Sequence, residues 1–165
     1  MKIKENDWVV HSQHGVGRVV GFETREFEEG DGQLYFRIAI EMGTLWVPVA
    51  ASSSELRRLT PKRDLAQFRA LLKSRPQPLA ADHRQRRTEL LEKLKDSSFQ
   101  ARCEVVRDLT ALGWGKALNE SCAAILRVVR QDLCSEWATS DGQSFAAASH
   151  EVEGLLLEGR KAFEG

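Results

Sequence analysis

The feature that most constrains the fold of this chain is a change of residue pattern near position 60. Before it, short apolar runs rich in valine and isoleucine are separated by glycines, as in the stretch 8–21. After it, apolar residues recur three and four positions apart to the end. The first pattern is typical of strands and the second of amphipathic helices. The chain is therefore predicted to be α+β, with a β-module at 1–59 and a helical domain at 60–165.

Two strands of the module are expected at 34–40 and 44–49, where every second residue is apolar. The residues predicted to face the core are Phe36, Ile38, Ile40, Leu45, Val47 and Val49. The same alternation places Arg37 and Trp46 outward, although packing of Trp46 in the core is an alternative because strand register is uncertain from sequence. Four or five strands in about 60 residues predict a small SH3-like or Tudor-like barrel.

Three connections complete the expected module. The acidic, glycine-containing segment 26–32 is interpreted as a hairpin loop, since glycine suits turn positions. The small polar residues of 50–54 predict another loop. Residues 56–59 are expected to add a last short strand.

Five amphipathic helices are expected after residue 60, forming a compact bundle. The first begins with Thr60 as N-cap and Pro61 at the first helical position, and it ends before the prolines of 76–78. The third runs from about Phe99 to Gly113. The expected N-caps of the second, fourth and fifth helices are Asp82, Asn119 and Ser144. The predicted apolar stripes are, in helix order, Leu65, Phe68, Leu71 and Leu72; Leu90, Leu91 and Leu94; Cys103, Val106 and Leu109; Ile125, Val128, Val129, Leu133 and Trp137; and Val152, Leu155, Leu156 and Phe163.

The net charge is zero, but the charge is unevenly distributed. Residues 61–100 carry ten Lys and Arg against five Asp and Glu, whereas the segments on either side are acidic. A basic middle in a neutral protein favours a local anionic partner over general coating of nucleic acid. The strongest candidate is the run 82–87, Asp-His-Arg-Gln-Arg-Arg, at a predicted helix start.

Several classes of protein are disfavoured. No apolar run is long enough to cross a membrane, and the N-terminus lacks the apolar core of a secretion signal, so a cytoplasmic protein is expected. Three cysteines without metal-binding spacing predict buried, reduced thiols. His11 and His14 lack an obvious third metal ligand. No local catalytic arrangement stands out, so we expect neither an enzyme nor a cofactor.

The remaining tryptophans are expected to have structural roles. Trp8 is predicted to cover an end of the barrel, Trp114 to fill the join between helices, and Trp137 to belong to an apolar stripe. Gly15-Val16-Gly17 is a poor phosphate-binding loop, because no helix is expected after it.

At several places the residues resemble the CarD/CdnL bacterial transcription regulators. In the β-module the similar segments are Val9-Val10, His14-Gly15-Val16-Gly17, Glu23-Thr24-Arg25 and Val47-Pro48. In the helical half they are 76–79, the arginine-rich start of the second helix, Leu91-Glu92-Lys93-Leu94 and Glu104-Val105-Val106-Arg107-Asp108-Leu109. The resemblance covers nearly the whole chain, and the order of the motifs is more specific than any one of them.

The resemblance implies a β-module that binds the lobe of the RNA polymerase β subunit and a helical domain at the upstream edge of the melted promoter, where it stabilises the open complex. The residues implied for polymerase binding are Glu23, Arg25, Arg37, Trp46, Val47 and Pro48. Those implied for DNA binding are His83, Arg84, Arg86 and Arg87. Two positions depart from the family: Trp46 stands where many members carry arginine, and His83 stands where many carry a tryptophan wedge.

Alternatives remain at each surface. Arg25 can instead pair with Glu23 or Glu26 within the module, and Arg86 and Arg87 can instead pair with Glu89 or Glu92 on a solvated helix face. The chain can also be an adaptor that docks on polymerase without touching DNA. The expected partners are thus polymerase and promoter DNA, with no membrane, and the expected oligomeric state is a monomer.

Overall fold

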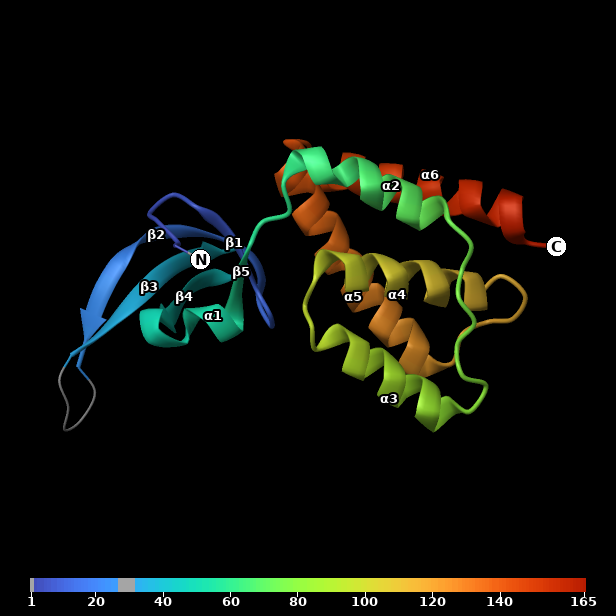
Figure 1. Ribbon diagram of the computed structural model, residues 1–165, viewed down its shortest axis with the longest axis horizontal. Coiled ribbons are helices and arrows are strands. Elements are labelled where there is room, and N and C mark those ends of the chain that lie inside the picture. Colours follow the sequence, from blue (N-terminus) through green and yellow to red (C-terminus); the bar gives the residue numbers. More distant parts are fainter. Residues whose placement is uncertain (1, 27–31) are drawn as a thin grey trace. The chain divides into compact units, whose positions relative to one another are not determined.

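The computed structural model describes residues 2–26 and 32–165 (Figure 1). The chain divides into two compact units, one ending at Leu59 and the other beginning at Thr60, and each is described by itself. The first contains a sheet and the second contains helices, which confirms the α+β class. Of the expected acidic hairpin loop, residues 27–31 lie outside the described residues.

The first unit is a five-stranded antiparallel sheet with the order β4-β3-β2-β1-β5 (Figure 1). Its strands are β1 (Trp8–His11), β2 (Gly15–Arg25), β3 (Gln33–Ile40), β4 (Gly43–Pro48) and β5 (Leu56–Arg58). β4 and β5 are therefore the two edges of the sheet, and the long β2–β3 ladder is at its centre.

The core of this unit lies on one face of the sheet. Phe36, Ile38 and Val47 are almost completely buried, as predicted, and they pack with Val9, Val19 and Leu56. Close packing explains Gly17, where an added Cβ would lie 2.5 Å from a methyl group of Ile38. Trp46 is 37% exposed and Arg37 is exposed. Both therefore face outward, and the alternative of a core Trp46 is wrong.

Two local expectations are also wrong. The segment 50–54 is not a loop, because a 3₁₀ turn, η1 (Val49–Ala51), leads into the single-turn helix α1 (Ser52–Glu55). Thr60 does not cap a helix, because its hydroxyl donates to the carboxylate of Glu136. The backbone stays extended at Pro61, and the 3₁₀ turn η2 (Lys62–Asp64) precedes the helix.

The second unit contains the five expected helices, α2 to α6 (Figure 1). They are α2 (Leu65–Lys73), α3 (His83–Leu94), α4 (Phe99–Leu112), α5 (Glu120–Asp141) and α6 (Phe145–Phe163). Asp82, Asn119 and Ser144 are N-caps as predicted, each accepting a hydrogen bond from the backbone N–H three residues ahead. Ser98 caps α4 in the same way.

Most of the predicted stripes form one core, which includes Leu65, Leu72, Leu109, Leu133 and Trp137. The exceptions are Leu91, Val128 and Phe163, and Phe163, the last residue of α6, is half-buried outside this core. Leu91 is 38% exposed and Val128 is 58% exposed, since each follows or precedes a buried position and so lies about 100° away around its helix. Trp8 is also mainly outside the core, with Arg18 stacked on its ring.

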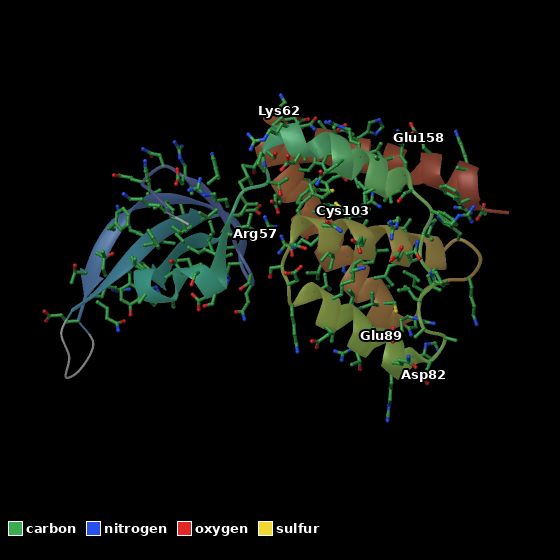
Figure 2. All side chains as sticks on the ribbon, viewed as in Figure 1. Arg57, Lys62, Asp82, Glu89, Cys103 and Glu158 are labelled. Carbon is green, nitrogen blue, oxygen red and sulfur yellow. The ribbon has the colours of Figure 1, made fainter. Side chains whose placement is uncertain are left out.

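All three cysteines are buried and unpaired, as expected. Cys103 lies among the helices (Figure 2), and burial raises the pKa of its thiol well above the usual range. Among the described residues, no helix is both long and apolar enough to cross a membrane.

Candidate functional site

The outer face of the sheet brings four of the predicted residues together. Glu23 and Arg25 lie on β2, Arg37 on β3 and Trp46 on β4, and we call these four the outer-face cluster. Arg37 is the direct cross-strand partner of Trp46 on one side and of Gly21 on the other. The cluster therefore spans three adjacent strands.

The indole of Trp46 lies across β3 towards β2. Its Nε1 donates a hydrogen bond to Oε2 of Glu23 over 2.7 Å, and the guanidinium carbon of Arg25 lies 4.5 Å from the centre of its ring. A cation stacked on an exposed aromatic ring contributes about 0.5–1 kcal/mol. Trp46 thus holds an acidic and a basic side chain in fixed positions on the surface.

Arg37 occupies the space that a glycine leaves free. A Cβ added to Gly21 would lie 3.4 Å from a terminal nitrogen of Arg37, so the guanidinium extends over this residue. Gly21 also follows a β-bulge that shifts the register after Val19. The bulge changes the direction in which the side chains of the second half of β2 point, as bulges commonly do near functional surfaces.

The other two residues predicted for polymerase binding lie on β4. The side chain of Val47 is buried in the core, so only its backbone can meet a partner. Pro48 ends the strand and is half-buried. β4 is an edge of the sheet, and an edge strand can pair with a strand of another protein.

The second surface is the start of α3, where Asp82 is the N-cap (Figure 2). His83, Arg84 and Arg87 are exposed there. Arg84 and Arg87 are three positions apart and therefore share one side of the helix. Asp82 accepts from the N–H of Gln85, and the remaining free N–H groups and the positive dipole end of the helix add to the attraction for an anion.

The alternative, in which Arg86 and Arg87 pair with Glu89 or Glu92, is not found among the described residues. Glu89 accepts from Gln85, and Glu92 pairs with Lys95. Among the described residues, no hydrogen bond or ion pair engages the guanidinium of Arg84 or Arg87. Both charges are therefore available to a partner.

Arg86 differs from its neighbours because it is buried, with 9% of its surface exposed. Its Nε donates to the carbonyl of Ala80 over 2.9 Å, and a terminal nitrogen donates to the carbonyl of Ala81 over 3.3 Å. Arg86 therefore fixes the loop before α3 and does not lie on the exposed basic face with Arg84 and Arg87.

His83 is held in place by two donors. The side-chain amide of Asn119 lies 3.0 Å from its Nδ1, and a terminal nitrogen of Arg86 lies 3.3 Å from the same atom. Since both partners can only donate here, we assign Nδ1 as the acceptor and place the ring proton on Nε2. Asn119 was predicted only as a helix cap, and its contact with His83 over 36 residues has no local sequence signal.

Family models match both units. The CarD-like/TRCF RID domain matches residues 3–60, and the CarD C-terminal domain matches residues 67–153. This chain belongs to the CarD family. It is also 30% identical over 132 residues to YdeB of Bacillus subtilis (strain 168), described as a candidate transcription factor, in an alignment that covers 79% of this chain and 86% of YdeB.

CarD membership confirms the family that the sequence motifs indicated. A CarD-family chain with both domains is an RNA polymerase-interacting transcription regulator, and the family is not enzymatic. The first matched domain contains the outer-face cluster, and the second contains the start of α3 and its contact with Asn119. Within the described part of the chain, no group of three or more His, Cys, Asp or Glu side chains is arranged to hold a metal ion.

Proposed function

We propose that this CarD-family protein binds the lobe of the RNA polymerase β subunit through its sheet and stabilises the promoter open complex through the start of α3. The observation that carries the proposal is the pair of uncompensated arginines, Arg84 and Arg87, in a unit separate from the outer-face cluster. A protein with one protein-binding surface and one anion-binding surface can bridge polymerase and promoter.

The outer-face cluster supplies the chemistry for protein binding. Trp46 offers a large, rigid aromatic surface, and tryptophan and arginine are enriched among residues that dominate binding energy. The stacked Arg25 presents donors that suit a carboxylate on the lobe. The edge of β4 adds backbone groups that can pair with a strand of the partner.

The start of α3 supplies the chemistry for DNA binding. Arg84 and Arg87 can contact phosphates on one strand, and such contacts position a protein without reading the sequence. Docking on polymerase raises the local concentration of this helix near the promoter. A neutral protein can in this way act on DNA that it binds poorly by itself.

His83 takes the place at the edge of the bubble where many members of this family carry tryptophan. An aromatic side chain stacked on a base contributes about 1–3 kcal/mol, and the smaller imidazole provides only part of that. This protein therefore stabilises the open complex less than a relative that carries tryptophan at this position. It slows collapse of the bubble by favouring one state of an existing equilibrium.

An adaptor without DNA contact is the second candidate. The observation that favours it is the hydrogen bond between Asn119 and His83, which orients the imidazole ring towards the start of α5. Footprinting of a polymerase–promoter complex with the full chain tests the two functions. Protection just upstream of the bubble, lost in an Arg84→Ala/Arg87→Ala variant, supports the bridge. Polymerase binding without any added protection of DNA contradicts it and supports the adaptor.

A further inference from the structure

A pocket of about 450 Å³ lies in the helical unit beside the start of α3. Its walls come from His83 and Arg86 of α3, from Leu112 at the end of α4, and from Lys116, Leu118 and Asn119 in the connection to α5. Among the residues that the structure describes, no acidic side chain lines it. The pocket therefore combines two cations with apolar and aromatic walls.

Arg86 is the most informative of these residues. A guanidinium has five N–H donors, and three of them are engaged by Ala80, Ala81 and His83. No carboxylate pairs with Arg86 among the described residues. A buried cation without a counter-ion is costly, and an anion in the pocket would offset that cost by using the remaining donors.

Lys116 supplies a second cation at the exposed rim. Asn119, the N-cap of α5, also lines the pocket, so two helix starts, those of α3 and α5, meet there. The dipoles of both helices favour an anion at this place. These features all favour negative charge on the ligand.

The other walls favour a flat, partly apolar group attached to that charge. Leu112 and Leu118 are half-buried and give apolar contacts. The ring of His83 is fixed by Asn119 and offers a stacking surface, with Nε2–H as a donor. Stacking on a ring and hydrogen bonds to an edge are the interactions by which proteins hold an unpaired base.

We propose that this pocket binds a single nucleoside phosphate unit, with its base against His83 and Leu118 and its phosphate between Arg86 and Lys116. The unit can come from an unpaired nucleotide of a DNA strand or from a free nucleotide. In the first case the inference rests on the proposed function, because α3 would bring the pocket to melted DNA.

Two variants of the full chain test the pocket without touching Arg86 or a helix cap. Ala117→Trp places a large side chain at the exposed rim, and Lys116→Glu reverses the charge of the second cation. Ala66→Trp and Lys161→Glu are matched controls at exposed positions of α2 and α6. The probes are adenosine monophosphate and a five-nucleotide single-stranded oligothymidylate, titrated at low salt and followed by NMR chemical shifts.

We expect at least one probe to shift the resonances of His83 and Lys116, and both pocket variants to weaken its binding by about tenfold, within the range for a stacked base. The controls should leave it unchanged. Binding of the oligothymidylate assigns a DNA strand as the source, and binding of adenosine monophosphate alone assigns a free nucleotide. Binding of neither probe, or equal binding by all variants, overturns the proposal.

The experiments distinguish an error in the proposed nucleotide pocket from an error in the proposed bridging of polymerase and promoter. If Arg84→Ala/Arg87→Ala shortens the lifetime of the open complex and no probe enters the pocket, the bridge stands and the pocket is wrong. If adenosine monophosphate binds and the arginine variant leaves the open complex unchanged, the pocket stands and the bridge is wrong.

Discussion

The indole of Trp46 on β4 donates a hydrogen bond to Glu23 on β2, over 2.7 Å, although β3 lies between the two strands. Two strand spacings amount to about 10 Å, so the indole lies flat across the middle strand and does not stand away from the sheet. The guanidinium of Arg25 lies over one face of the indole ring. This arrangement presents Trp46 and Arg25 to a partner as one rigid unit.

Removal of this unit should weaken docking. We expect Trp46→Ala to lower affinity for the purified polymerase β lobe by about thirtyfold, as for a residue that dominates an interface. Glu23→Ala should have a smaller effect, because it frees the indole without removing it, and Glu23→Gln should have the least because an amide oxygen can still accept. Calorimetric titration measures all three. An unchanged affinity for Trp46→Ala would place docking elsewhere.

The arginines of α3 should act on DNA and not on docking. Arg84→Ala and Arg87→Ala should each reduce the salt dependence of the equilibrium constant for binding of the protein to the polymerase–promoter complex by about 0.9 in the logarithmic slope, the value for one lost phosphate contact. Lys161→Ala is the matched control on α6.

Arg25→Glu should abolish polymerase binding, which none of the α3 variants should do. Equal loss of polymerase binding by both kinds of variant would contradict the separation of surfaces.

His83→Trp should lengthen the lifetime of the open complex. A larger aromatic ring gains stacking of about 1–3 kcal/mol on a base, and part of that gain should appear as slower dissociation. Lifetimes after a heparin challenge measure the effect, with Gln85→Trp as a control on the same exposed turn. A lifetime that does not change would mean that this helix start is not at the edge of the bubble.

Glu136 should be essential for the stability of the helical unit. Its fully buried carboxylate accepts from the backbone N–H and the hydroxyl of Thr60 and lies 3.5 Å from a terminal nitrogen of Arg102. Glu136→Ala leaves these donors buried and should lower the free energy of unfolding by about 3 kcal/mol. Thr60→Val should cost about 1.5 kcal/mol.

Urea denaturation followed by circular dichroism measures both effects. Glu164→Ala, at an exposed carboxylate paired with Arg160, should change stability by less than about 0.5 kcal/mol. A Glu136→Ala variant as stable as Glu164→Ala would contradict the structural role of the buried carboxylate.

The sheet unit should lose stability in mild acid through His11. Burial and the nearby His14 lower the pKa of His11 below the ordinary histidine value of 6.5, and Glu55 opposes them. Its Nδ1 accepts from the backbone N–H groups of Gln13 and His14, which also requires the neutral ring. Below pH 6.5 the unfolded state therefore binds more protons than the folded state, and the free energy of unfolding falls as the pH drops.

This pH dependence can be measured by denaturation between pH 7.5 and 5.5. His11→Asn keeps a side-chain acceptor near the turn but cannot titrate, so its curve should be flatter than that of the wild type. His150→Asn, on α6, is the control. A His11→Asn curve as steep as that of the wild type would assign the titration to another group.

The helix caps show how much can be predicted from local sequence. Asp82, Asn119 and Ser144 act within three residues of their own position, so the chemistry of the cap and its effect are adjacent in the chain. Thr60 has the same side-chain chemistry, yet it bonds to Glu136, 76 residues away. A competing partner at long range has no signature in the neighbouring residues.

The candidate surfaces show the same difference between features that neighbouring residues predict and contacts that depend on distant residues. Alternation along β4 correctly indicated that Trp46 faces outward, because strand side chains change face at every residue. It could not show that Trp46 reaches Glu23, since that contact depends on the order of three strands. Likewise, charge alone grouped Arg84, Arg86 and Arg87, but packing of the preceding loop separates the buried Arg86 from the other two.

Residue pattern alone was therefore enough for the α+β class, the strand faces, the five helices and the family, because periodicity, caps and motifs are properties of neighbouring residues. The partners of Trp46, His83 and Glu136 were decided by the tertiary structure. They come from elements distant in the chain, and only folding brings their side chains within hydrogen-bonding distance.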